Sequence, residues 1–424
     1  MKVLFKKIIC KFQRLGPGFI TGAADDDPSG VATYSIAGAQ FGYRMNWMTV
    51  FLTPLMISVQ EMCGRIGMTS GIGLAGVIRR YYSRKLLFFT ISLLLIANVV
   101  NIGANLGVMA ASFQMILGLP YIFWLIAITM FSITLQIFVS YRIYSSYLKW
   151  MGFTLLVYGV TALITHQDWL QVIRWTIIPH IEFNKAYLMT MVGFLGTTIS
   201  PYLFFWQASE QVEEEIKAGK IHDFEEHPDT TIRDIRRMRI DTSAGMIFSN
   251  LVSSCIIVTT AATLHNSGIT DIETPHQAAL ALRPLAGNFA YLLFTVGIVG
   301  IGLQSVPILA GGVAYAFAES FGFKEGLAKK LTEAKVFYGI IALATCFGAF
   351  MNIVGINAIK ALYYTAILNG IVAVPLIAII IKLADDERIV GKHKSQKWSR
   401  FFAWVAFFLM GISSILMIFF LIRS

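Results

Sequence analysis

The chain has 424 residues, of which 56% are hydrophobic and 14% charged, and its mean hydropathy is +0.67. A water-soluble protein of this length could not bury so much apolar surface, so the composition excludes a soluble enzyme and indicates an integral membrane protein. The net charge of +10 would suit a nucleic-acid-binding protein, but the positions of the basic residues explain this charge in another way.

Eleven apolar stretches are long enough to cross a bilayer as helices. With the N-terminus inside the cell, 28 of the 34 Lys and Arg residues fall in segments on the cytoplasmic side, as is typical of cytoplasmic loops. We therefore expect a multi-pass protein of the cell (inner) membrane that binds no nucleic acid, with its N-terminus in the cytoplasm and its C-terminus outside. The expected spans are residues 16–39, 46–64, 86–113, 120–140, 150–165, 187–212, 241–264, 288–317, 336–352, 358–381 and 401–422.

The first span is interrupted near its middle by the run Asp25-Asp26-Asp27-Pro28. Proline leaves the carbonyls before it without helical partners, and these carbonyls lie at the partly negative end of a half-helix, where they attract a cation. A carboxylate inside a membrane is costly, so it is a functional candidate. Asp27 is best placed for a cation, although it could instead only cap the broken backbone. We expect Asp25 and Asp26 to line a wet vestibule or to pair with neighbours.

The sixth span is broken in the same way at Ser200-Pro201, five helices after the first break. Paired breaks of this kind indicate inverted repeats with a binding site at the middle of the membrane. We therefore expect one transmembrane domain over residues 1–424, with five-helix repeats at about 16–165 and 187–381. The helix at about 401–422 would lie outside the repeats.

The chain resembles the NRAMP divalent-metal transporters over most of its length. The similar stretches are Gly16-Pro-Gly-Phe, residues 60–80, and residues 304–322 from Gln-Ser to Glu-Ser-Phe-Gly. The resemblance implies an all-α integral membrane protein with the LeuT-type fold, which has eleven transmembrane helices and two inverted five-helix repeats with helices 1 and 6 broken. It also implies that the protein is a transporter and not an enzyme. The metal ion is then a transported substrate and not a cofactor.

The sequence departs from the family pattern at both breaks. Where the family has Asp-Pro-Gly-Asn, this chain keeps the carboxylate at Asp27 but has Gly30 in place of the amide. Where the family has Ala-x-x-Met-Pro-His, it has Thr197, Ser200 in place of the thioether, and Tyr202 in place of the histidine. The resemblance thus implies metal ligands at Asp27, at the carbonyls of Gly30 and Thr197, and at the hydroxyl of Ser200.

These replacements change the expected ion. Thioethers favour soft transition metals, whereas carboxylate, hydroxyl, carbonyl and water suit hard ions such as Mg²⁺. The third span has no acid and instead has Asn98, Asn101 and Asn105 on one face, and Gln207 stands where the family has a second histidine. The pattern is similar to that of the NRAMP-related magnesium transporters. It favours import of Mg²⁺, and also Mn²⁺, by alternating access without proton coupling.

Three alternatives stay open. The nearest is a proton-coupled Mn²⁺/Fe²⁺ importer of the ordinary type, in which Asp25, Asp26 or Glu210 could carry a proton. An amino-acid or organic-cation carrier of the same architecture is disfavoured by the carboxylate at the first break. A membrane-embedded enzyme is disfavoured because the expected spans contain no cluster of His, Cys and Glu and no nucleophile–base pair. The sequence does not indicate an oligomeric state.

Overall fold

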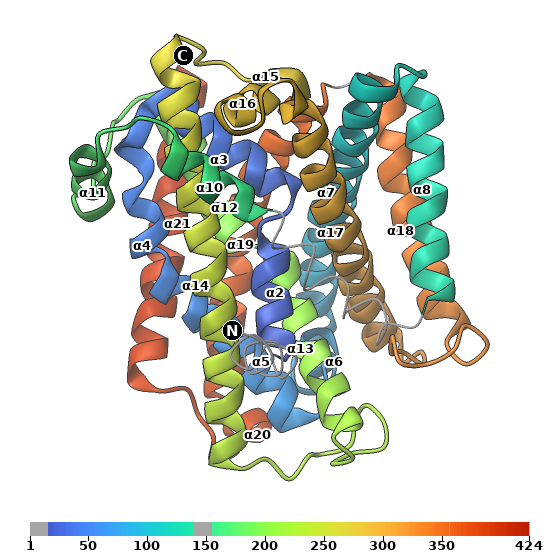
Figure 1. Cartoon of the computed structure of the whole chain (residues 1–424). Helices are drawn as coiled ribbons and strands as arrows, with labels where there is room; N and C mark the ends of the chain where they lie inside the picture. The colour runs from blue at the N-terminus through green and yellow to red at the C-terminus, as the bar shows by residue number, and fades with distance from the viewer. Residues whose placement is uncertain (1–15, 140–154, 356, 424) are drawn as a thin grey trace, which may run out of the picture.

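The computed structural model describes residues 16–139, 155–355 and 357–423, and every regular element in these ranges is a helix (Figure 1). The helices are α2 (Pro17–Asp25), α3 (Pro28–Phe41), α4 (Trp47–Phe51), α5 (Thr53–Ser70), α6 (Leu74–Tyr81), α7 (Arg84–Leu117), α8 (Tyr121–Phe138), α10 (Leu156–Ile164), α11 (Trp169–Ile177), α12 (Lys185–Thr198), α13 (Pro201–Lys217), α14 (Ile232–Thr263), α15 (Pro275–Ala279), α16 (Arg283–Ala286), α17 (Ala290–Phe321), α18 (Lys335–Met351), α19 (Ala358–Asp385), α20 (Glu387–Val390) and α21 (Lys397–Arg423).

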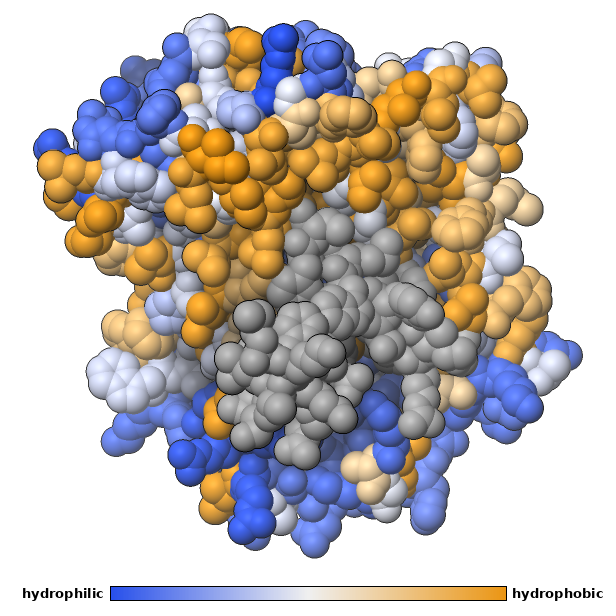
Figure 2. Space-filling view, viewed as in Figure 1, coloured by the Kyte–Doolittle hydropathy of each residue, from blue (hydrophilic) through white to orange (hydrophobic). Residues whose placement is uncertain are grey.

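Seven described helical segments are long and apolar enough to cross a membrane, so the chain is a multi-pass membrane protein. Figure 2 shows a broad zone of hydrophobic side chains between hydrophilic groups at the two ends of the molecule. The expected count of eleven spans stays a prediction. Each half of the first span is a separate short helix, and part of the span expected at 150–165 lies outside the described residues.

Several helices run beyond the apolar stretches that predicted them. The expected span at 241–264 lies in α14, which already begins at Ile232 because the side chains of Thr231 and Asp234 form a capping box. Similarly, α7 begins after Ser83, whose side chain accepts a hydrogen bond from the Leu86 amide. Hydropathy marks the part of a helix that lies in lipid, whereas capping residues fix where it begins.

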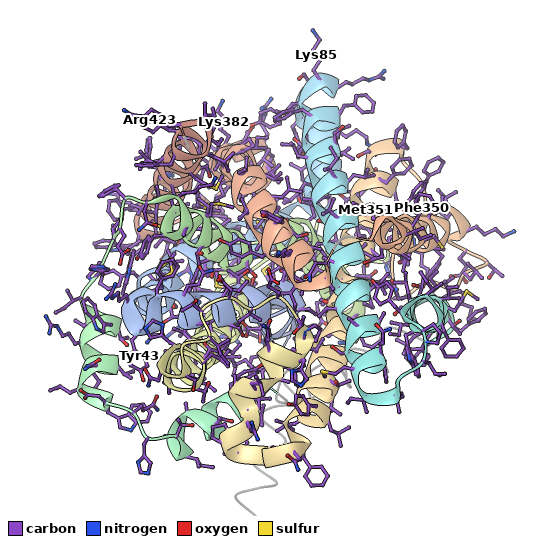
Figure 3. All side chains as sticks on the ribbon, turned by 90° about the horizontal axis from the view of Figure 1, so that it is seen from above. Tyr43, Lys85, Phe350, Met351, Lys382 and Arg423 are labelled. Atoms are coloured by element: carbon purple, nitrogen blue, oxygen red, sulfur yellow. The ribbon has the colours of Figure 1, made fainter. Side chains whose placement is uncertain are left out.

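The first broken helix occupies the centre of the bundle (Figure 1). The half α2 packs along α14, and α3 packs against α14, α19 and α12. Glycines permit this close contact: a Cβ at Gly22 would lie 2.2 Å from the backbone carbon of Gly245 in α14. Elsewhere in the bundle, α7 packs against α17. Seen from above, α7 lies lengthwise across the view with Lys85 at its tip, so it is strongly inclined to the bundle axis (Figure 3).

We call the end of the bundle that holds α20 and the start of α14 the α20 end. The C-terminus lies at the opposite end (Figure 1). The expected cytoplasmic N-terminus lies in residues 1–15, outside the described residues. The orientation of the termini therefore stays a prediction.

Candidate metal site

The first break separates α2 from α3 at Asp26 and Asp27, as the sequence predicts. Asp27 has extended backbone, with φ −67° and ψ 172°, and is the N-cap of α3. Its Oδ1 accepts hydrogen bonds from the amide of Gly30 (2.9 Å) and the hydroxyl of Ser29 (2.5 Å). Asp27 therefore stabilises the start of α3 whether or not it also binds an ion.

The second oxygen of Asp27 faces α7. Its Oδ2 accepts a hydrogen bond from Asn105 Nδ2 at 3.2 Å, and the same amide nitrogen lies 3.0 Å from Ser305 Oγ in α17. A carboxylate oxygen has more than one lone pair, so Oδ2 keeps acceptor capacity for a cation. Sequence reasoning placed Asn105 on a polar face but did not link it to Asp27 or Ser305.

The second break separates α12 from α13 at Ile199 and Ser200. Ser200 is extended, but its side chain makes no capping bond to α13. Its hydroxyl lies 2.7 Å from the carbonyl oxygen of Thr197 and 3.1 Å from that of Gly196, so it donates back to the end of α12. A serine here satisfies orphan carbonyls at a helix C-terminus and leaves its own lone pairs free to accept.

The two breaks contact each other directly. A Cβ at Gly30 would lie only 3.1 Å from Thr197 Oγ1 and 3.5 Å from the carbonyl oxygen of Asp25. Tyr202 Oη donates to the carbonyl of Ala24 at 3.0 Å, which joins α13 to the end of α2. The absence of a side chain at Gly30 therefore permits this close approach of the two breaks.

The four predicted site residues are all buried at this junction, but they are not all in mutual contact. Gly30 and Thr197 lie together, whereas the described bonds of Asp27 run to α3 and α7 and those of Ser200 run to α12. Within the described ranges, Thr197 Oγ1 has no hydrogen-bond partner. Their roles as ligands stay predictions.

Asp25 and Asp26 face a different helix from Asp27. Ser249 Oγ of α14 lies 3.0 Å from Asp25 Oδ2 and 3.2 Å from Asp26 Oδ1, and Ser253 Oγ lies 3.2 Å from Asp26 Oδ1. These two serines, one helical turn apart, are hydrogen-bond partners of the two carboxylates that sequence reasoning missed. Their i, i+4 spacing within an apolar span was the available signal.

The chemistry available at the junction is that of oxygen ligands. Among the described residues, no three His, Cys, Asp or Glu side chains are grouped so as to hold a metal ion. The four predicted ligands comprise one carboxylate, that of Asp27, together with the Ser200 hydroxyl and two backbone carbonyl oxygens. Such a set suits a hard ion that keeps some of its water.

Comparisons with known proteins agree with this architecture. Residues 18–420 match the sequence model of the Nramp family, described as natural resistance-associated macrophage protein-like. A divalent metal cation transporter, MntH, of Klebsiella pneumoniae is 23% identical over 402 residues, which cover 93% of this chain and 91% of the relative. The MntH of Listeria welshimeri is 23% identical over 433 residues, which cover 99% and 92%.

Two solved structures share the fold. A manganese transporter of Eremococcus coleocola superposes with a TM-score of 0.72 at 17% identity, over 95% of this chain and 84% of that chain. Mhp1, a nucleobase-cation-symport-1 family transporter, superposes with a TM-score of 0.64 at 12% identity, over 96% and 90%. At these identities the likeness shows the fold alone.

Proposed function

Because the chain belongs to the Nramp family, we propose that it is a secondary transporter that carries a hard divalent cation, Mg²⁺ first and Mn²⁺ also, across the cell membrane by alternating access. Its relatives are named as divalent metal cation transporters, which supports the class of substrate. The ion is cargo, and the protein needs no cofactor for this task. We place the protein in a bacterial inner membrane, with the N-terminus in the cytoplasm and the C-terminus outside.

The observation that carries the choice of a hard ion is the oxygen-only junction between the two breaks. Ser200 stands where the family pattern has a thioether, and its hydroxyl folds back onto α12. Tyr202 stands where the pattern has a histidine, and its hydroxyl donates a hydrogen bond to the Ala24 carbonyl. Neither position offers the sulfur or nitrogen that favours a soft metal.

In this proposal each predicted residue has one role. Asp27 supplies the charge through Oδ2, because its Oδ1 is engaged with the start of α3. Gly30 and Thr197 supply backbone carbonyls, and Ser200 supplies a hydroxyl, directly or through a retained water. The domain over residues 1–424 would comprise repeats at about 16–165 and 187–381 that move relative to each other, with the helix at about 401–422 outside them.

The driving force would be the membrane potential, which is worth about 4.6 kcal/mol for a divalent ion per 100 mV. The helix α7 (Arg84–Leu117) contains no acidic residue and places Asn105, rather than a carboxylate, beside Asp27. Proton coupling is therefore absent from the proposal.

A second candidate is a proton-coupled Mn²⁺ importer. It is favoured by the buried carboxylates of Asp25 and Asp26, which face Ser249 and offer places for a proton near the transport site. The manganese transporter among the structural neighbours is consistent with it. The two candidates differ in the ions they admit and in whether protons accompany them.

Uptake into proteoliposomes tests both candidates. Mg²⁺, Mn²⁺ and Cd²⁺ are compared for the wild type, Asp27→Asn and Ser29→Ala, while the internal pH is recorded. Asp27→Asn keeps an oxygen that can cap α3 but removes the charge, whereas Ser29→Ala removes a cap contact and keeps the charge.

We expect Mg²⁺ entry at constant internal pH, lost in Asp27→Asn and retained in Ser29→Ala. Acidification of the vesicles during Mn²⁺ or Cd²⁺ entry, with no Mg²⁺ entry, would establish the coupled importer instead. Equal uptake by wild type and Asp27→Asn would show that Asp27 serves only as a helix cap.

A further inference from the structure

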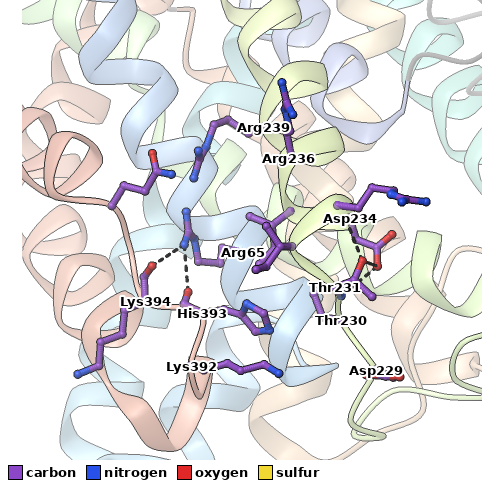
Figure 4. A pocket seen from close by; sticks show the side chains of 14 residues that line it. Arg65, Asp229, Thr230, Thr231, Asp234, Arg236, Arg239, Lys392, His393 and Lys394 are labelled. Atoms are coloured by element: carbon purple, nitrogen blue, oxygen red, sulfur yellow. Dashed lines mark hydrogen bonds between the residues drawn. The ribbon is translucent and has the colours of Figure 1, made fainter.

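A cavity of about 1110 Å³ lies at the α20 end, away from the two helix breaks (Figure 4). Its walls are the end of α5, the start of α14 and the segment between α20 and α21. Six basic side chains line it, against only two carboxylates, those of Asp229 and Asp234. The basic residues are Arg65, Arg233, Arg236, Arg239, Lys392 and Lys394.

Three of these six cations have ion-pair partners within the protein. Arg65 and Arg239 share the single carboxylate of Glu61, the latter at 3.1 Å, and Lys394 pairs with Glu387 at 2.7 Å. One of the two lining carboxylates is also engaged, because Asp234 accepts a bond from Lys220 at 2.9 Å.

The other three cations, Arg233, Arg236 and Lys392, have no ion-pair partner within the described ranges. The sequence of residues 1–15 and 140–154 contains no Asp or Glu that could serve. The cavity therefore holds an excess of positive charge, which an anion from outside the chain can neutralise.

The cavity wall is held by a buried residue. Arg65 is 2% exposed, and its Nη1 donates to the carbonyl oxygens of His393 (3.0 Å) and Lys394 (2.7 Å), as Figure 4 shows. These bonds fix the segment that carries Lys392 opposite the start of α14, which carries Arg233. Arg65 Nε is also buried and has no acceptor within the described part of the chain. If the basic residues served only to set the orientation of the chain in the membrane, no buried arginine would be needed to hold the Lys392 segment in place.

We propose that this cavity binds a phosphate-bearing anion, and that its natural source is the headgroup of an anionic membrane lipid. Arginine presents planar sets of donors that match phosphate oxygens, and lysine adds a point charge. The rim favours a lipid over a soluble phosphate. Ile232, which lines the cavity, is 77% exposed, and Trp398, just beyond the lining segment, is 72% exposed. An exposed indole beside basic residues is typical of the membrane–water interface.

The test measures binding to the purified full-length chain in detergent at low salt. Native mass spectrometry follows titration with short-chain phosphatidylglycerol, with phosphatidylcholine as the zwitterionic comparison and inorganic phosphate as competitor. The cavity variant is Arg233→Gln/Arg236→Gln/Lys392→Gln. The matched control, Lys324→Gln/Lys330→Gln/Lys335→Gln, removes the same charge from exposed residues outside the cavity.

We expect wild type and control to bind phosphatidylglycerol alike, and the cavity variant to bind it roughly 100-fold more weakly, since each basic residue near anionic lipid strengthens binding about fivefold. Competition by millimolar phosphate would assign the site to a soluble phosphate anion, and its absence would assign it to the lipid. Equal binding by the cavity variant and the control, or no binding of either ligand by wild type, would overturn the proposal.

If the triple variant does not fold, Lys392→Gln replaces it. Lys392 is exposed and makes no ion pair among the described residues, so this change leaves the fold unaltered. It should weaken binding about fivefold, and unchanged binding would also overturn the proposal. Because no transport is measured, the result is independent of which ion the protein carries.

Discussion

The two helix breaks look alike in sequence but are stabilised differently. At the first break the Asp27 carboxylate caps α3, so the residue that carries the charge also holds the backbone. At the second break no side chain caps α13, and the Ser200 hydroxyl donates back to α12. Charge and conformation are therefore coupled at the first break and separate at the second. We therefore expect the side chain of Ser200 to be replaceable without loss of the break's shape, whereas a replacement of Asp27 that lacks a side-chain oxygen also removes the cap of α3.

The breaks also differ in what surrounds them. Asp27 is connected through Asn105 to Ser305, so the first break is tied to α7 and α17. The second break is tied mainly to the first, through Tyr202 and the Ala24 carbonyl, and through the pair Tyr34 and Thr198 at 3.2 Å. A change that breaks these two hydrogen bonds should therefore also displace the first break.

The largest effect is expected from alanine at the capping position. Asp27→Ala should reduce Mg²⁺ uptake at least 100-fold. The proposed pair is the Asp27 carboxylate and the transported ion, and losing one partner of a buried charge pair costs about 3–5 kcal/mol. It should also lower the stability by about 1 kcal/mol through loss of the cap. Ser200→Ala removes no N-cap and loses only the hydrogen bonds to the Gly196 and Thr197 carbonyls, so it should lower the unfolding midpoint in detergent less than Asp27→Ala does. Equal destabilisation by the two changes would contradict the contrast between the breaks.

A methyl group at the contact between the breaks should have the next largest effect. In Gly30→Ala the new Cβ would lie 3.1 Å from Thr197 Oγ1. We expect about a tenfold loss of uptake and a cost of about 1–3 kcal/mol from overpacking. Adding Thr197→Ala to this variant should restore part of the uptake and part of the stability.

The control for this change is Gly339→Ala in α18, where a Cβ meets nothing within 4 Å. It should be neutral in uptake and in thermal unfolding. Wild-type uptake by Gly30→Ala would show that the junction has more room than these distances indicate.

Ion selectivity tests whether the second break can change its ligand alone. Ser200→Met introduces a thioether, which favours soft metals, so Cd²⁺ uptake should rise several-fold relative to Mg²⁺. Because the Ser200 side chain does not cap α13, the second break should keep its shape. Competition uptake with both ions, compared with Ser200→Ala, measures the change. An unaltered Cd²⁺/Mg²⁺ ratio would argue against Ser200 as a ligand.

The smallest effect is expected from the bond that joins the breaks. Tyr202→Phe removes the hydrogen bond to the Ala24 carbonyl and should lower the stability by about 1 kcal/mol. Uptake should fall only a few-fold, because the ring still packs in the core. Tyr34→Phe, which removes the bond to Thr198, is the matched comparison. Complete loss of uptake in Tyr202→Phe with normal folding would instead give its hydroxyl a direct role.

Much of the architecture could be predicted because it follows from local chemistry. Proline after Asp27 and after Ser200 predicts both breaks, and α3 and α13 begin at these prolines. The apolar stretches predict the long helices, but not their extensions beyond these stretches, which depend on caps such as Thr231. Short motifs shared with the NRAMP transporters predict membership of that family and the LeuT-type fold, and both predictions are confirmed.

The sequence by itself determined where the chain breaks and that a carboxylate lies at the first break, because proline and aspartate act on their own backbone. Only the tertiary structure decided which groups meet there. Asn105 of α7 reaches Asp27 across 78 residues of sequence, and Ser249 of α14 reaches Asp25 and Asp26 across 224 and 223 residues. The rotation and tilt of packed helices set these contacts, and glycines such as Gly22 permit the close approach. No periodicity within one segment encodes the register between two helices.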